Sequence, residues 1–207
     1  KQVWVETYIL EPDRVGTRTI EALTDAARRG CEVVLLYDAV GGTRITEAFT
    51  KPLRDAGGRI FIFNPLLKWK RINPLLRRDH RKIIVIDGHI GFCGGVNFSE
   101  DYGSTRHGNG RFHDAHVKVE GPCVRDLAAV FASSIWMASD DETNLPLPQR
   151  AAKAGETFVQ VLASRGREGR RAIQRSIRLT IRHAAQHCWI TTPYFIPPPS
   201  LVRAINR

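Results

Sequence analysis

A histidine, a lysine and an aspartate at fixed spacing are the residues of the 207-residue chain best suited to chemistry: His80, Lys82 and Asp87. A glycine pair and an amide side chain follow them: Gly94, Gly95 and Asn97. Glycines allow a backbone to approach a ligand closely. An imidazole, an ammonium group and an amide directed at one point suit the binding and transfer of a phosphoryl group.

A short apolar run, residues 83–86, separates the lysine from the aspartate. It is too short for a typical helix and consists of β-branched residues, which predicts a buried strand. Side chains two apart on a strand share a face, so we expect His80 and Lys82 to point the same way where it begins. Asp87 then lies in the turn at its far end, and residues 92–93 lie on the returning strand.

The amino-acid composition limits the classes of molecule that the chain is expected to bind. The chain has 31 Lys and Arg against 21 Asp and Glu, a formal charge of +10, which favours polyanions such as nucleic acid or an anionic bilayer surface. The four cysteines show no CxxC spacing, so we interpret them as small core residues rather than zinc ligands. No apolar run approaches the roughly 18 residues of a membrane-spanning helix. Because the chain begins at Lys1, we interpret it as a fragment.

The first third of the chain alternates strands and helices. Strands are predicted at residues 3–10, 31–38 and 59–64, and helices at 17–29 and 45–56. This order is typical of an α/β fold with right-handed crossovers and a mainly parallel sheet. Such sheets bind ligands at the ends of their strands.

The remainder continues the alternation less regularly. Further strands are predicted at 112–121, 157–162 and 188–196, and helices at 124–137 and 170–186.

Segments 3–10 and 188–196 are both Trp-containing apolar runs followed by proline and a helical pattern, which indicates a duplicated unit. We therefore expect a first repeat at 1–138, a linker or mobile loop at 139–155, and the start of a second, truncated repeat at 156–207.

The order HxKxxxxD, glycine pair, asparagine resembles the signature of the phospholipase D superfamily. Longer segments are similar to bacterial cardiolipin synthases, among them WVETYILEPDRVG at 4–16, RRDHRKIIVIDG at 77–88 and HDAHVKVEGP at 113–122. The resemblance implies a phospholipase D-like α-β-α sandwich with a mainly parallel mixed sheet, present as one full repeat plus the start of a second. One departure is Phe112 with His113, where family members often have Trp and Arg.

The resemblance also implies an activity. It is a phosphatidyltransferase that forms cardiolipin from two phosphatidylglycerols through a phosphohistidine. Family members carry two such motifs and need no metal or other cofactor. The second motif would come from the missing C-terminal part of the chain or from a second subunit. The expected setting is the bacterial inner membrane, with the active site on a soluble domain at its surface.

The resemblance assigns roles to individual residues. His80 would be the nucleophile, and the phosphate would be held by Lys82, Asn97 and Gly95. Asp87 and Asp114 complete the catalytic set: we expect Asp87 to brace the turn and Asp114 to orient His80.

A basic segment directly before the motif is a candidate contact for lipid head groups or the membrane surface. It comprises Lys68, Trp69, Lys70 and Arg71.

Two alternatives remain open. The first is a phosphodiesterase of the same superfamily that hydrolyses phospholipid or nucleic acid, although we do not expect nucleic acid as a partner, since Trp69 alone is a weak stacking platform. The second is an inactive phosphate-binding fragment. Glu6 stands apart as a carboxylate in an apolar strand. Burying it alone would be costly, so we expect it to have a partner.

Overall fold

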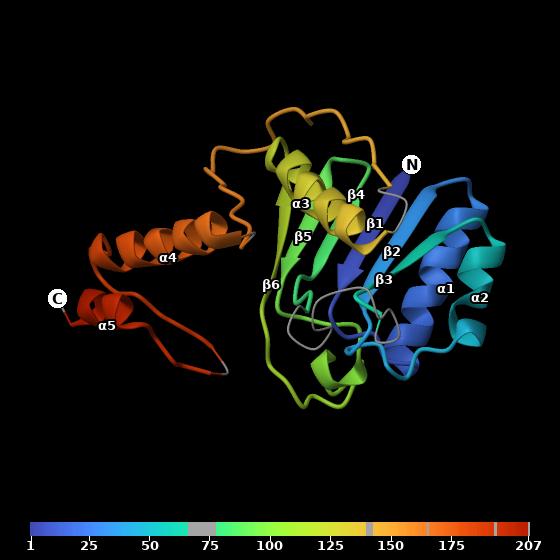
Figure 1. Ribbon diagram of the computed structural model, residues 1–207, viewed down its shortest axis with the longest axis horizontal. Coiled ribbons are helices and arrows are strands. Elements are labelled where there is room, and N and C mark those ends of the chain that lie inside the picture. Colours follow the sequence, from blue (N-terminus) through green and yellow to red (C-terminus); the bar gives the residue numbers. More distant parts are fainter. Residues whose placement is uncertain (66–77, 140–142, 165, 193, 207) are drawn as a thin grey trace. The chain divides into compact units, whose positions relative to one another are not determined.

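The computed structural model describes residues 1–65, 78–139, 143–164, 166–192 and 194–206 (Figure 1). The chain divides into two compact units, Lys1–Val159 and Gln160–Arg207. The first unit contains the motif stretch, and the second contains two helices. The predicted assignment of these parts to a full repeat and a truncated repeat stays a prediction.

Six strands form one mixed sheet in the order β3-β2-β1-β4-β5-β6. Their bounds are β1 Gln2–Thr7, β2 Glu32–Asp38, β3 Arg59–Phe63, β4 Ile83–Ile86, β5 Ile90–Gly94 and β6 His116–Glu120. The pairs β1–β2 and β2–β3 are parallel, and the other three pairs are antiparallel. Four strands therefore share one direction, in agreement with the expected α/β fold. The parallel pairing is confined to β1–β3. Strands β4 and β5 are joined by a short turn, which permits only a hairpin.

Helices cover both faces of the sheet. On one face α1 (Arg14–Arg28) and α2 (Glu47–Asp55) pack against side chains of β1 and β2. On the other, α3 (Cys123–Ala138) contacts strands β3 to β6 (Figure 1). Helix α1 begins where the Asp13 side chain accepts a hydrogen bond from the Gly16 amide at 2.9 Å. A short 3₁₀ helix, Glu100–Tyr102, follows β5. The predicted α-β-α layering is thus present.

The central strand β1 contributes to both halves of the core. Val5 packs with Leu35 on the α1 side. Trp4 points to the α3 side, where its ring stacks on Phe131 with centroids 5.3 Å apart and both side chains fully buried. Glu6 is buried on the same side as Trp4, since alternate residues of a strand share a face. An acidic group therefore lies inside the layer between the sheet and α3.

The chain from residue 157 on, which includes the second unit, departs from the sequence prediction. Helices α4 (Gly166–Arg182) and α5 (Pro199–Ile205) are present, but the described residues of 157–162 and 188–196 form no strand. The side chains of Trp189 and Ile196 are 86% and 88% exposed. An apolar run forms a strand only where another strand satisfies its backbone groups, and no described segment of this unit supplies one. The predicted strand 112–121 is also shorter, because pairing begins at His116.

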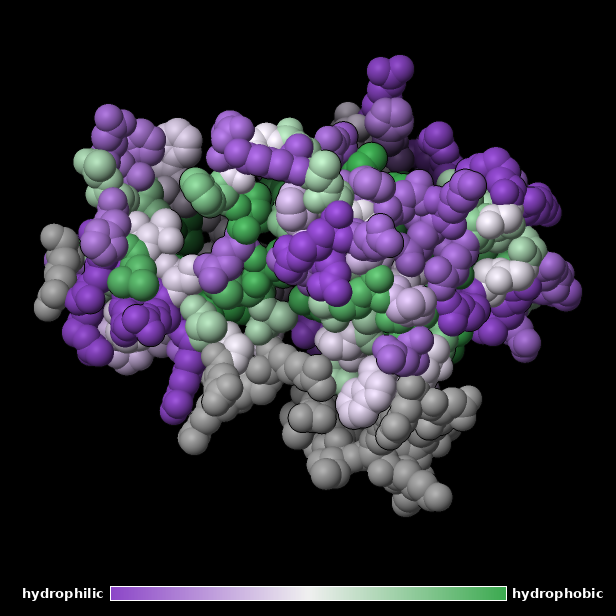
Figure 2. Space-filling view, turned by 90° about the horizontal axis from the view of Figure 1, so that it is seen from above, coloured by the Kyte–Doolittle hydropathy of each residue, from purple (hydrophilic) through white to green (hydrophobic). Residues whose placement is uncertain are grey.

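The face of the molecule seen in Figure 2 is largely hydrophilic. Hydrophilic residues cover most of the face in Figure 2, with smaller hydrophobic patches between them. Among the helices that the structure describes, none combines the length and apolar character needed to cross a membrane.

Replacing Phe131 with alanine tests the stacked pair in the core. Phe131→Ala removes a fully buried ring and leaves a cavity against Trp4, so we expect a loss of about 3–5 kcal/mol in the free energy of unfolding. Urea unfolding measures it. The comparison variant is Trp136→Ala on the same helix, where the side chain is 46% exposed, so the loss should be clearly smaller than for Phe131→Ala. Equal losses for the two variants would contradict the packing described.

Candidate functional site

The segment that carries the histidine is held at the end of β2 by one buried carboxylate. Asp38 is fully buried, and its Oδ2 accepts a hydrogen bond from the Asp79 amide at 2.9 Å. Its Oδ1 accepts from the Val40 amide at 2.8 Å and from the Arg78 guanidinium at 3.0 Å. The chain before β4 is thus fixed at Arg78 and Asp79, immediately before His80.

Tyr8 brings the histidine and the lysine together. Its ring stacks on the His80 imidazole, with centroids 3.8 Å apart and an angle of 20° between the planes. The Lys82 ammonium lies 5.3 Å from the centre of the Tyr8 ring and donates to the His80 carbonyl at 2.7 Å. Stacking and a cation over an aromatic face both stabilise this arrangement. The predicted pair therefore shares one aromatic support.

Asn97 is attached to the same short segment of chain. Its Oδ1 accepts from the Ile9 amide at 2.9 Å and lies 3.5 Å from the Thr7 hydroxyl. The side chain is buried, and its Nδ2 has no hydrogen-bond acceptor among the residues that the structure describes. No described residue therefore occupies the two N–H donors of this amide, which are available for a ligand, while residues 7–9 link it to His80 and Lys82.

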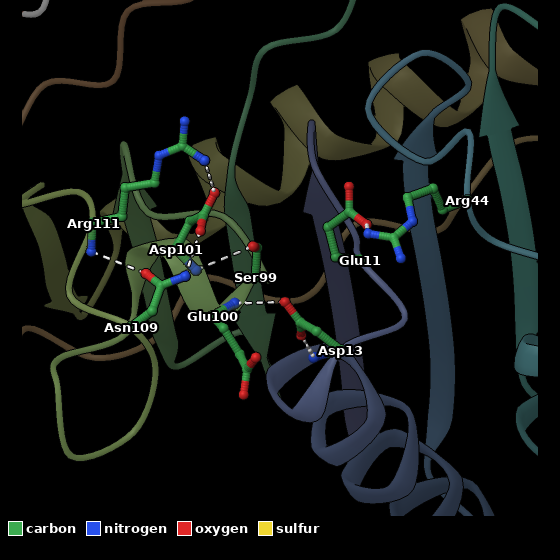
Figure 3. A network of polar contacts seen from close by, with 9 residues as sticks. Glu11, Asp13, Arg44, Ser99, Glu100, Asp101, Asn109 and Arg111 are labelled. Carbon is green, nitrogen blue, oxygen red and sulfur yellow. Dashed lines mark hydrogen bonds and ion pairs between the residues drawn. The ribbon is translucent and has the colours of Figure 1, made fainter.

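The loop after Asn97 is fixed by a polar network (Figure 3). Asp13, which caps α1, also accepts from the Glu100 amide at 2.6 Å. Asp101 accepts from the Asn109 side chain at 2.6 Å and from the Arg111 guanidinium at 3.2 Å. These contacts join the loop to α1 and close it on itself, which limits how far Asn97 can move.

Asp114 lies against the second glycine of the pair. A β-carbon placed on Gly95 would come within 2.1 Å of the Asp114 Oδ1, so only glycine leaves room for this carboxylate. The Gly95 amide donates to the Ala115 carbonyl at 2.9 Å. No hydrogen bond joins Asp114 to His80 across the described part of the chain, and its charge acts on Lys82 instead. The predicted roles of Asp114 in orienting His80 and of Gly95 in binding phosphate stay predictions.

Partial burial and the neighbouring lysine favour a neutral imidazole at His80. Partial burial, followed by the nearby Lys82 ammonium, lowers the pKa of His80, and the carboxylates of Asp38 and Asp79 oppose this shift. Burial also lowers the pKa of Lys82, with Asp79 and Asp114 opposing it. An imidazole with a lowered pKa retains its lone pair at neutral pH, as a nucleophile or a base requires.

Asp87 lies at the other end of β4 from His80 and Lys82. Its Oδ1 accepts from the Gln2 amide at 2.6 Å, and its own amide donates to the Gln2 carbonyl at 2.9 Å. Its φ of 52° places it in the left-handed region that a tight turn requires. The structure therefore ties Asp87 to the start of β1 and does not bring it to the residues around Tyr8.

Three contributors were missed by reasoning from sequence: Tyr8, Asp38 and Asp79. Asp38 and Asp79 each offered a weak signal, because one ends an apolar run and the other directly precedes the histidine. Tyr8 offered none, since nothing local predicts stacking on a residue 72 positions away.

Two further expectations concern metals and the membrane. No group of three or more His, Cys, Asp or Glu side chains among the described residues is placed to hold a metal ion. The basic segment Lys68, Trp69, Lys70 and Arg71 lies outside the described residues.

Comparison with known proteins identifies the family. A family model described as "Cardiolipin synthase, PLD-like domain" matches residues 1–133. The chain belongs to this family of phospholipase D-like domains, which confirms the resemblance inferred from the motif.

Individual relatives agree with this result. "Cardiolipin synthase" of Halalkalibacterium halodurans is 34% identical over 210 residues, covering 99% of this chain and 41% of that protein. "Cardiolipin synthase 1" of Bacillus cereus is 30% identical over 205 residues, covering 94% and 40%. The chain thus spans about 40% of the length of these relatives. A crystal structure of a phospholipase D family member, Nuc from Salmonella typhimurium, aligns with a TM-score of 0.46 and 16% identity, covering 67% of this chain and 79% of that one.

The titration of His80 tests the electrostatics. Lys82→Met removes the positive charge that helps to lower the pKa of His80, so we expect that pKa to rise. NMR titration of the His80 ring protons measures it. Lys118→Met is the matched control, because Lys118 is an exposed lysine of β6 paired with Glu120. A His80 pKa that stays constant or falls in Lys82→Met would exclude the assigned contact.

Proposed function

We propose that this chain forms part of a phosphatidyltransferase that makes cardiolipin and glycerol from two phosphatidylglycerols. One observation carries the proposal: an imidazole with a lowered pKa stacks on Tyr8 beside the Lys82 ammonium, and the amide donors of Asn97 are anchored to the same segment. The family and its relatives supply the substrate class, since those proteins are named cardiolipin synthases.

In the proposed first step, a ring nitrogen of His80 attacks the phosphorus of one phosphatidylglycerol. The bond from phosphorus to the oxygen of the head-group glycerol breaks. The leaving oxygen takes a proton from an acid outside these residues, which we assign to the histidine of a second motif. The charges on the phosphoryl oxygens are met by Lys82 and by the Asn97 amide, with the Gly95 backbone beside them. The product of this step is a phosphohistidine.

In the second step, a hydroxyl of another phosphatidylglycerol attacks the phosphohistidine. The acid of the first step, now deprotonated, takes the hydroxyl proton, so cardiolipin leaves and His80 returns to its neutral form. A histidine that forms a covalent intermediate needs its other ring nitrogen held by an acceptor. We assign this role to Asp114, which lies beside Gly95 and acts on Lys82. For Asp87 we propose a bracing role in the turn.

The setting proposed is the surface of the bacterial inner membrane. A formal charge of +10 favours the anionic lipids from which the substrate is drawn. The segment Lys68–Arg71 precedes the histidine closely and is assigned to contact with head groups. Hydrolysis differs from transfer only in that water replaces the lipid hydroxyl in the second step, so product analysis distinguishes the two.

Loss of the histidine should abolish the reaction of the full-length protein. With vesicles of labelled phosphatidylglycerol, we expect His80→Ala to lower cardiolipin formation by about 10³-fold or more, because the phosphohistidine cannot form. His89→Ala is the matched control, since His89 is exposed in the turn at the opposite end of β4. Cleavage of single-stranded DNA with untouched vesicles would overturn the proposal, and labelled phosphatidic acid as main product would favour a hydrolase.

Residues 1–207 alone should show little turnover, because the acid for the leaving group is assigned to a motif outside them. A phosphoryl group should instead be trapped on His80, where mass spectrometry of the acid-sensitive adduct detects it. Robust steady-state turnover by a monomer of this chain would contradict the need for a second motif.

A further inference from the structure

Two buried carboxyl groups lie beneath the site, and no described residue donates a hydrogen bond to the oxygens between them. Glu6 on β1 is 1% exposed, and both of its carboxyl oxygens are fully enclosed without a hydrogen-bond donor among the described residues. Asp79 is 6% exposed, and its Oδ2 is likewise enclosed without a donor from the described chain. Asp79 raises the pKa of Glu6 both through its charge and through side-chain hydrogen bonding, which requires the two side chains to lie close together. Two buried acceptors in contact repel unless a proton lies between them.

The neighbouring groups do not replace that proton. From the segment before β4, the Arg81 guanidinium donates to the Ser134 hydroxyl of α3 at 2.7 Å. Ser134 and Arg81 both favour the ionised form of Glu6, but burial, which is the largest effect, and Asp79 oppose them. The result is a pKa of Glu6 well above its ordinary value. Glu6 is also the more deeply buried of the two side chains, at 1% exposed against 6% for Asp79, so the proton is assigned to Glu6.

Asp79 connects this pair to the reactive histidine. Its amide donates to Asp38, its Oδ1 accepts from the Arg81 amide at 3.2 Å, and His80 is the next residue. Of its two carboxylate oxygens, Oδ2 is the one that no described residue occupies and that a proton of Glu6 can reach. A hydrogen bond there would complete the restraint on the turn that aims His80 at Tyr8, and would let Asp79 keep the negative charge that opposes the fall in the pKa values of His80 and Lys82.

We propose that Glu6 is a positioning residue: a neutral carboxylic acid whose O–H donates to Asp79 Oδ2 and thereby fixes the segment that carries His80. Glu6 acts through Asp79 and does not touch the substrate. Its catalytic consequence rests on the proposed function, but the shared proton and the orientation of His80 do not.

The sign of the pH effect follows from the protonation. The pKa of Glu6 is higher in the folded chain than in the unfolded chain. At pH values between the two, the folded chain holds a proton that the unfolded chain has released. Stability from this group is therefore complete below the unfolded pKa and declines as pH rises towards the folded one. Glu6→Gln supplies an N–H donor of nearly the same shape that cannot ionise, so the variant should not show this decline.

The test uses the full-length protein and three variants. Glu6→Gln keeps a donor, Glu6→Leu removes it, and Glu120→Gln is the control, because Glu120 is an exposed carboxylate of the edge strand β6. Infrared difference spectroscopy at pH 7 should show the carbonyl band of a protonated carboxyl group in wild type and in Glu120→Gln, and its loss in Glu6→Gln. The band's absence in wild type, or its survival in Glu6→Gln, would overturn the proposal.

A second measurement separates positioning from simple support of the fold. By NMR, the His80 titration should stay close to wild type in Glu6→Gln and shift in Glu6→Leu, and cardiolipin formation should fall about tenfold or more only in Glu6→Leu. An unchanged His80 titration in Glu6→Leu would refute the positioning role. If Glu6→Leu does not fold, the test uses the pH dependence of stability. Should the decline of stability with rising pH seen in wild type persist in Glu6→Gln, the proposed role of Glu6 is refuted. A wild type with the band but no lipid transfer would remove the proposed function and leave the carboxyl pair supported.

Discussion

The geometry of the site depends on the buried carboxylate of Asp38. A fully buried charge is tolerated only where hydrogen bonds and an opposite charge compensate it, and Asp38 obtains both from two backbone amides and the Arg78 guanidinium. Two of these three donors belong to the segment that leads into β4. The position of His80 is therefore a consequence of satisfying a charge at the end of β2.

Strand direction explains why these groups meet. Parallel strands β1 and β2 end at the same edge of the sheet, which brings Tyr8 and Asp38 close together. Strand β4 is antiparallel to β1, so it begins where β1 ends and delivers His80 and Lys82 to that edge. The mixed pairing of the sheet is thus what joins the aromatic support to the residues that it holds. Asp87, at the other end of β4, is excluded from the site by the same geometry.

Much of this could be predicted from sequence, and the rest could not for definable reasons. The spacing of His80 and Lys82 and the β-branched run after them are local signals, so strand β4 was predicted with its observed bounds. Helices α1 and α3 followed from apolar periodicity in the same way. The described residues of 188–196 form no strand, because a local pattern does not reveal whether a pairing strand exists. The contacts of Tyr8 and Asp79 join residues far apart in the chain, and no short pattern encodes them.

The hydrogen bond that anchors Asn97 fixes which end of its side-chain amide faces the site. With its oxygen bound to the Ile9 amide, rotating the side-chain amide by half a turn would place donor against donor. The main chain at the end of β1 thus fixes which end of the side chain is presented, before any ligand arrives. An aspartate of the same shape could still accept the hydrogen bond from the Ile9 amide. Its other oxygen would then face a bound anion in place of the two N–H groups, so two negative charges would oppose each other. A change of a single atom could therefore preserve the fold and reverse the polarity of the site.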